Sequence, residues 1–83
     1  MILARMRGGS SIALNPKYIT RIEKVDYYDL QDGVEAHIHG CYVNIEGSNW
    51  TYTIEHPFDE FVKAVDAHGK TDGSISLVEG ITL

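Results

Sequence analysis

The stretch WTYTIEHPFDEFVKAVDAHG, from Trp50 to Gly69, decides the fold because its hydrophobic period changes half-way. In the first half Trp50, Tyr52 and Ile54 alternate with polar residues, which is typical of a half-buried strand. In the second half apolar residues recur at i, i+3, i+4 and i+7, which predicts one buried stripe of a helix over residues 57–68. The stripe consists of Phe58, Phe61, Val62 and Val65. A strand is therefore expected to lead directly into a helix.

Both ends of this helix carry recognisable signals. Pro57 suits the first helical position, where its missing N–H would have no partner. Asp59 and Glu60 fall in the first turn, where the helix dipole favours negative charge. Gly69 can adopt the left-handed conformation that ends a helix.

Further strands are expected upstream, where alternating apolar residues lie between turn signals. They are residues 2–7, 11–14, 19–28 and 34–45. In the first of these strands Ile2, Ala4 and Met6 share the apolar face. The clearest turn is Gln31-Asp32-Gly33, because Asp-Gly tolerates the positive φ values that a tight hairpin needs.

Gly40 interrupts the alternation of the fourth strand. The inward face before it is expected to carry Val34, Ala36 and Ile38. If the strand runs straight through Gly40, Tyr42 joins that core face and Cys41 lies with the histidines. If Gly40 seats a β-bulge, the register flips and the inward residues become Cys41, Val43 and Ile45. We favour the bulge, because Cys-Val-Ile is a better core face than Tyr-Asn-Glu.

Together these elements predict an α+β fold. We expect an antiparallel, β-rich meander or small open barrel of five or six strands, with one helix packed on it. Residues 1–69 are expected to form a single β-rich domain. Residues 70–83 read as a linker and an apolar C-terminal tail, which could return as an edge strand or pair with another copy.

Length and composition bound the class of protein. The chain has 83 residues, 43% of them hydrophobic, which suits one small folded domain. A core of this size gains from self-association, so a homodimer is one expected state. Cys41 is the single cysteine, so no internal disulfide can form and a reducing compartment fits. With no apolar run long enough for a membrane span, and a start too short and charged for a signal peptide, we expect a cytoplasmic protein without a membrane partner.

The net charge of −5 hides an uneven distribution. Residues 1–24 hold five basic groups against one acid, whereas residues 25–83 hold eleven acids against two lysines. One interpretation is that these opposite charges meet across neighbouring strands. The other is an acidic face that docks on a basic partner.

The strongest candidate for a binding surface is the acidic, tyrosine-bearing region 26–46. Its adjacent tyrosines cannot both face inward in a strand, and aromatic residues flanked by acids are common in protein interfaces. The candidate protein-binding residues are Asp26, Tyr27, Tyr28, Asp29, Asp32, Glu35 and Glu46. The alternative for the tyrosines is one core residue and one that covers the surface.

Catalytic and metal chemistry find little support in the sequence. His37, His39 and Cys41 would share one face of an unbroken strand, and imidazole with thiolate suits zinc, but no fourth ligand or supporting shell is marked. We therefore assign no metal site and no cofactor, and interpret the histidines as exposed strand residues. No glycine-rich phosphate loop or activated nucleophile is present, so an enzyme is not expected. Nucleic acid is an unlikely partner for a chain with this acidic balance.

Two segments carry a resemblance to a known family. ALNPKYITRIE (Ala13–Glu23) and YTIEHPFDEFVKAVD (Tyr52–Asp66), after an opening Met-Ile and a glycine at position 8, are similar to the small FlbD-like (SwrD-type) proteins of bacterial flagellar operons. Residues 24–49 and the C-terminal tail have no counterpart in that pattern. The resemblance implies a non-catalytic accessory protein that acts through contacts, and it supplies no catalytic residues.

The sequence thus predicts a small non-enzymatic protein that binds another protein, with a basic surface on that partner. One alternative is a phage- or mobile-element-encoded inhibitor whose acidic face blocks a basic nucleic-acid-binding surface of a host enzyme. Another is a metal-binding module that uses His37, His39 and Cys41.

Overall fold

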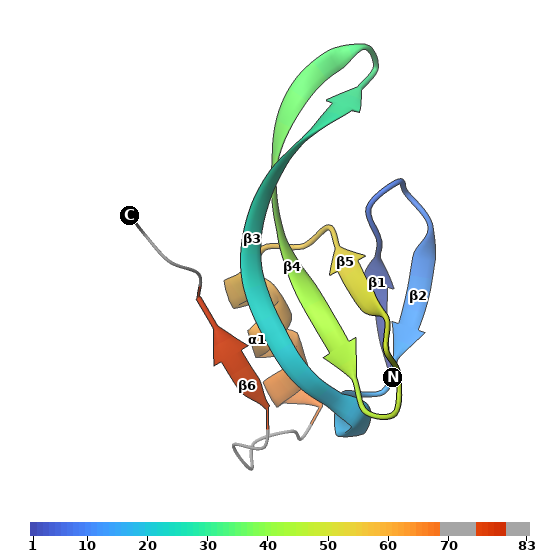
Figure 1. Ribbon diagram of the computed structural model, residues 1–83, viewed down its shortest axis with the longest axis vertical. Helices are drawn as coiled ribbons and strands as arrows, with labels where there is room; N and C mark the ends of the chain where they lie inside the picture. The colour runs from blue at the N-terminus through green and yellow to red at the C-terminus, as the bar shows by residue number, and fades with distance from the viewer. Residues whose placement is uncertain (69–74, 80–83) are drawn as a thin grey trace.

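A computed structural model of the chain describes residues 1–68 and 75–79. The elements are, in chain order, β1 (Ile2–Arg5), β2 (Ser11–Leu14), a 3-10 helix (Pro16–Tyr18), β3 (Ile19–Gln31), β4 (Val34–Ile45), β5 (Thr51–Ile54), α1 (Phe58–Ala67) and β6 (Ser76–Val78) (Figure 1). Strands dominate, and a single α-helix packs on them among the described residues. The predicted β-rich α+β fold is confirmed.

The strands form a four-stranded sheet, in the order β5-β4-β3-β6, and a separate antiparallel pair, β1-β2. The strand β6 lies parallel to β3, so the sheet is mixed, whereas the sequence predicted only antiparallel pairing. This part of the tail returns to the sheet as an edge strand. The pair β1-β2 is joined to β5 by a bridge between Met6 and Ile54 and by the hydrogen bond from Arg7 N to Thr53 O, at 3.0 Å. The described strands therefore follow one another in an open arrangement that does not close into a barrel.

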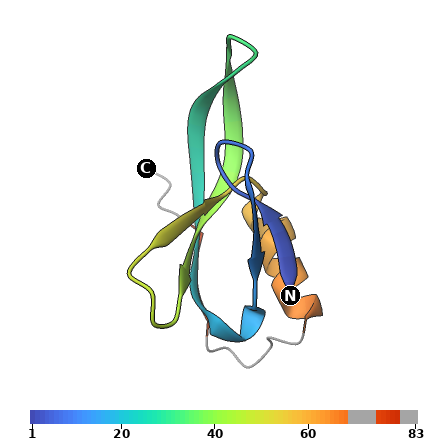
Figure 2. The same ribbon diagram turned by 90° about the vertical axis from the view of Figure 1, so that its right-hand side faces the viewer.

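The core lies between α1 and the strands (Figures 1 and 2). From α1 it receives Phe58, Phe61 and Val65, while Val62 is half-buried at its edge. The strands contribute Ile2, Ala4, Leu14, Ile19, Ile22, Cys41, Val43 and Ile54. Full burial of a large apolar side chain contributes about 1.5–3 kcal/mol. The predicted helical stripe and the predicted inner face of β1 both lie in this core.

The start of α1 is shifted by one residue from the prediction. Pro57 occupies the N-cap, with φ −56° and ψ 142°, and its carbonyl accepts a hydrogen bond from Phe61 N at 3.0 Å. Asp59 and Glu60 lie in the first turn as expected. The proposed helix terminator Gly69 lies outside the described residues.

The strands β3 and β4 are unusually long, with 13 and 12 residues. β4 has its predicted bounds, whereas β3 continues beyond its predicted end at Tyr28 to Gln31. They are joined by Asp32 and Gly33, whose φ values of 54° and 79° are those of the predicted tight hairpin turn. Residues 24–39 of this hairpin extend beyond the core, and we call them the arm (Figure 1). The arm explains why Val34 is 67% exposed although the alternation placed it inward.

The predicted bulge at Gly40 is wrong, although the residues expected to turn inward with it do so. The ladder between β3 and β4 is continuous here, from the pair Arg21 and Asn44 to the end of the hairpin. The glycine is needed for another reason: a Cβ on Gly40 would lie 2.7 Å from Ile54 O and 3.1 Å from Tyr27 Cε1. Glycine is needed here because the backbone of Ile54 approaches closely, and not because the register changes.

The burial pattern changes at Gly40 because different elements cover the two faces of the hairpin. Cys41 and Val43 belong to the same face as His37 and His39, and α1 packs on that face only over the body of the domain. In the arm it is the opposite face that is partly covered. The buried face of the hairpin therefore changes at Gly40, although the pairing of β3 with β4 does not shift there.

Two smaller predictions also fail. Trp50 was expected on the inward face of a strand, but β5 begins at Thr51 and the indole is 74% exposed. The first strand ends at Arg5 rather than at Arg7, and Met6 makes only an isolated bridge. Among the described residues no helix is long and apolar enough to cross a membrane.

Candidate functional site

The arm has two different faces. Because side chains alternate along a strand and cross-strand partners share a face, the register assigns each residue of the arm to one of them. The open face carries Lys24, Asp26, Tyr28, Leu30, Glu35, His37 and His39, all of them exposed. The covered face carries Val25, Tyr27, Asp29, Ala36 and Ile38, all of them half-buried.

Aromatic rings form a row along the open face. The rings of Tyr28 and His37, which are cross-strand partners, stack with centroids 4.9 Å apart and planes 19° apart. His37 and His39 follow one another on β4 with ring centroids 4.7 Å apart. Cross-strand aromatic pairs stabilise a sheet locally, so this row stiffens the arm.

Asp26 lies beside both histidines. Its Oδ1 is 2.7 Å from His39 Nδ1 and 4.0 Å from His37 Nε2. Asp26 and His39 are opposite one another in the ladder, which brings their side chains together. Within the described part of the chain these three residues form a group whose potential metal-ligating atoms all lie within 4.8 Å of one another.

The tip of the arm is apolar. Tyr28 is 63% exposed, Leu30 72% and Val34 67%. The register places Tyr28 and Leu30 together on the open face and Val34 on the opposite face. A shallow hollow of about 320 Å³ lies on the arm, lined by Tyr28, Asp29, Leu30 and Glu35. Exposed apolar groups that are clustered rather than scattered commonly mark interaction surfaces.

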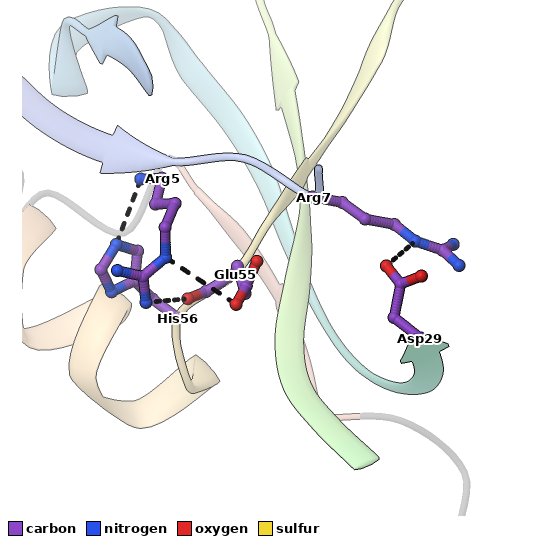
Figure 3. A network of polar contacts seen from close by, with 5 residues as sticks. All are labelled: Arg5, Arg7, Asp29, Glu55 and His56. Atoms are coloured by element: carbon purple, nitrogen blue, oxygen red, sulfur yellow. Dashed lines mark hydrogen bonds and ion pairs between the residues drawn. The ribbon is translucent and has the colours of Figure 1, made fainter. Parts of the chain in front are cut away.

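The covered face is pinned by the turn between β1 and β2. Arg7 Nε donates to Asp29 Oδ2 at 3.0 Å (Figure 3). The guanidinium carbon of Arg7 lies 4.5 Å from the centroid of the Tyr27 ring. A second guanidinium nitrogen lies 3.5 Å from the carbonyl oxygen of Tyr28. One arginine therefore ties the middle of the arm to the rest of the domain.

A second arginine joins β1 to the segment between β5 and α1 (Figure 3). The backbone N–H of Arg5 donates to His56 Nε2 at 3.2 Å, and Arg5 Nε lies 3.8 Å from Glu55 Oε1. The basic N-terminal residues therefore meet acids from later in the chain, as one of the two charge interpretations predicted.

The structure brings some of the predicted binding residues together and separates others. Asp26, Tyr28 and Glu35 share the open face, and Asp32 forms the turn at the tip. Tyr27 and Asp29 lie on the covered face and interact with Arg7, so they contribute mainly to holding the arm. Glu46 belongs to the turn after β4, at the opposite end of the hairpin, where its N–H donates to Tyr18 O at 2.7 Å.

The two adjacent tyrosines have different environments. The hydroxyl of Tyr27 is buried without a hydrogen-bond partner among the described residues. Burial raises the pKa of Tyr27, the carboxylate of Glu55 adds to the increase, and Arg7 opposes it. Tyr28, by contrast, is mostly exposed and available to a partner.

Cys41 does not join His37 and His39 in one exposed site. Although Cys41 belongs to the same face, it lies in the core, and its thiol donates to His56 O at 3.7 Å. Burial raises the pKa of Cys41 from its ordinary value of 9.0 to about 12. The thiolate that a metal or a substrate would need is therefore disfavoured.

The sequence prediction missed two residues of the arm surface, Leu30 and Val34. Their positions in the sequence could have indicated this. Both lie close to the Asp32-Gly33 turn, and neither belongs to a longer apolar segment that could pack in the core. Comparison with models of protein families, with curated proteins and with solved structures finds no match. The resemblance to FlbD-like proteins therefore stays a prediction, and function has to be argued from the geometry.

Proposed function

We propose that this chain is a small non-enzymatic protein that binds another protein through its arm. The observation that carries the proposal is the exposure of Tyr28, Leu30 and Val34 at the end of a hairpin that extends beyond the core. Leu30 and Val34 lie outside the core, and Tyr28 stacks on the exposed ring of His37. Their burial against a partner would be favourable, at about 25 cal/mol per Å² of apolar surface.

The chemistry of the tip supports a protein partner. On the open face Tyr28 and Leu30 form an apolar centre and the carboxylate of Glu35 lies beside them, as in many protein interfaces. Asp32 and Glu35 take part in no ion pair within residues 1–68 and 75–79. These free carboxylates favour a partner that presents basic groups around an apolar patch.

The arm is also stiff enough to present this surface. Arg7 holds the covered face of the arm, the Tyr28–His37 stack supports its open face, and a tight turn closes its end. A surface that is already ordered loses less conformational entropy on binding. A recognition surface on this arm is therefore largely formed before the partner arrives.

The distribution of the acids favours an accessory role over that of an inhibitor that blocks a nucleic-acid-binding surface. Such an inhibitor needs a continuous acidic face, whereas here Asp26 and Glu35 lie on one face and Asp29 on the other. In addition, Asp29 is neutralised by Arg7, and Glu46 lies far along the hairpin. The acids of the arm are better suited to steering a basic partner than to imitating a phosphate backbone.

A capture experiment with matched variants tests the proposal. The tagged domain is used to retain partners from the lysate of its source, beside Tyr28→Ser/Leu30→Ser and the control Trp50→Ser/Leu3→Ser. The control removes an aromatic and a leucine of similar exposure, 74% and 76%, from outside the arm. We expect a partner that the wild type and the control retain and the arm variant loses.

The same partner should be retained at high salt with only a moderate loss, because the centre of the surface is apolar. Complete release by salt, together with a nucleic-acid-binding partner, would instead support the inhibitor. Equal retention by both variants would contradict binding through the arm.

A further inference from the structure

We propose that Asp26, His37 and His39 form a binding site for a divalent transition-metal ion of the zinc type on the open face of the arm. This site adjoins the apolar surface, because Tyr28 stacks on His37, but it does not depend on the protein partner. It differs from the group suggested by the sequence, because the carboxylate of Asp26 on β3 takes the place of the Cys41 thiol.

The separations between the ligand atoms suit a shared ion. Two ligands of a tetrahedral zinc ion, each about 2.0–2.1 Å from the metal, lie about 3.3 Å apart. Asp26 Oδ1 is 2.7 Å from His39 Nδ1 and 4.0 Å from His37 Nε2, so the observed distances lie on either side of that value. All three ligand atoms lie within 4.8 Å of one another, so rotations of these exposed side chains would bring them around one ion.

The backbone places these side chains without a loop or a hinge. His37 and His39 are two residues apart on β4 and so point the same way, and Asp26 is the direct cross-strand partner of His39. The stack with Tyr28 restrains the ring of His37. Sites built on paired strands hold their geometry better than sites on loops.

The donor set indicates the class of metal. Two imidazoles and one carboxylate suit Zn²⁺, Cu²⁺ and Ni²⁺, whereas Mg²⁺ and Ca²⁺ prefer sites made of oxygen ligands. The side chains of Asp26, His37 and His39 are 46%, 44% and 61% exposed, so a fourth position is open to water or to another ligand. Three protein ligands and one open position is a common arrangement for zinc.

The test is a calorimetric titration of the untagged protein with ZnCl₂, followed in parallel by NMR of the histidine rings. We expect one equivalent of Zn²⁺ to bind, with shifts confined to His37 and His39. The substitutions His37→Ala and His39→Ala should each weaken binding at least ten-fold. Asp26→Asn should weaken it less, because the amide oxygen remains but the charge does not. MgCl₂ should give no saturable binding.

Two control variants distinguish zinc binding at this site from zinc binding elsewhere on the chain. His68→Ala removes an exposed histidine at the end of α1, and Cys41→Ala removes the only thiol of the chain. Both variants should keep the wild-type affinity for zinc. Circular dichroism is used to check that each variant is folded. The proposal is overturned if zinc does not bind, if His37→Ala and His39→Ala bind as tightly as the wild type, or if His68→Ala has an equal effect.

Discussion

The α-carbon of Gly40 faces the carbonyl oxygen of Ile54 so closely that a methyl group there would lie 2.7 Å from the oxygen. The contact marks the point where the arm leaves the body of the domain, next to the bridge between Met6 and Ile54 that joins β1 to β5. The close approach of two backbones, rather than a bulge, therefore accounts for the glycine in the middle of β4.

The substitution Gly40→Ala should destabilise the domain by about 1–3 kcal/mol, because the carbonyl of Ile54 is backbone and cannot rotate away. Urea unfolding followed by circular dichroism measures the change. Glu35→Ala, at an exposed position of the same strand, should change stability by less than about 0.5 kcal/mol. Equal stability of Gly40→Ala and the wild type would show that the backbone segments at Gly40 and Ile54 are not in close contact.

Cys41 should be unreactive in the folded protein. Because burial raises the pKa of its thiol to about 12, the thiol stays protonated at pH 8, and iodoacetamide should label it only after unfolding. Mass spectrometry of samples treated with iodoacetamide in the presence and absence of urea measures the fraction of Cys41 that is labelled. Rapid labelling of the native protein would place the thiol at the surface.

The same pKa predicts how stability changes in alkali. Above pH 9 an unfolded Cys41 releases its proton while the folded one keeps it, so the unfolded state binds fewer protons and stability falls as pH rises toward 12. The slope should approach about 1.4 kcal/mol per pH unit for one group. Between pH 9 and 10 the variant Cys41→Ala should lose this slope, and an unchanged slope would contradict the assignment.

The helix should depend on its buried aromatic residues. Phe61 is 3% exposed, so Phe61→Ala should cost about 3–5 kcal/mol, a large part of the 5–15 kcal/mol typical of a whole domain. Trp50→Ala, at an aromatic residue that is 74% exposed, should have little effect. Thermal unfolding measures the stability of the two variants. A similar loss of stability in both would contradict the burial of Phe61 in the core.

The ion pair between Arg7 and Asp29 should hold the arm more than it stabilises the whole domain. Both side chains are more than a third exposed, so a double-mutant cycle with Arg7→Ala and Asp29→Ala should give a coupling of at most about 1 kcal/mol. Hydrogen exchange in residues 24–39 should nevertheless accelerate in Arg7→Ala. If exchange in the arm is unchanged, the contact does not restrain it.

Local patterns predicted the elements of this fold well. The change of period between Tyr52 and Val65 gave the strand, the helix and its buried stripe, because both depend on burial against the nearest layer. The Asp-Gly turn was equally clear, since positive φ values are needed there. Failures came where a distant segment decides the outcome: α1 covers one face of β4 near Val43, and Arg7 covers the other face near Tyr27.

The candidate site was predicted in part for the same reason. The sequence identified Tyr28 and the acids near it, but it could not show that the strands continue far enough to expose Leu30 and Val34. Nor could it pair Asp26 with His39, because that contact depends on the register of two strands. Residues on one strand can be grouped from spacing alone, whereas groups that cross a sheet need its pairing.

Site-specific photocrosslinking tests the central claim most directly. A photoreactive phenylalanine analogue is placed at Leu30, on the arm, or at Leu3, a leucine of similar exposure on β1. Our account predicts a crosslinked adduct with the captured partner from position 30 and none from position 3. An adduct from position 3 without one from position 30 would contradict it.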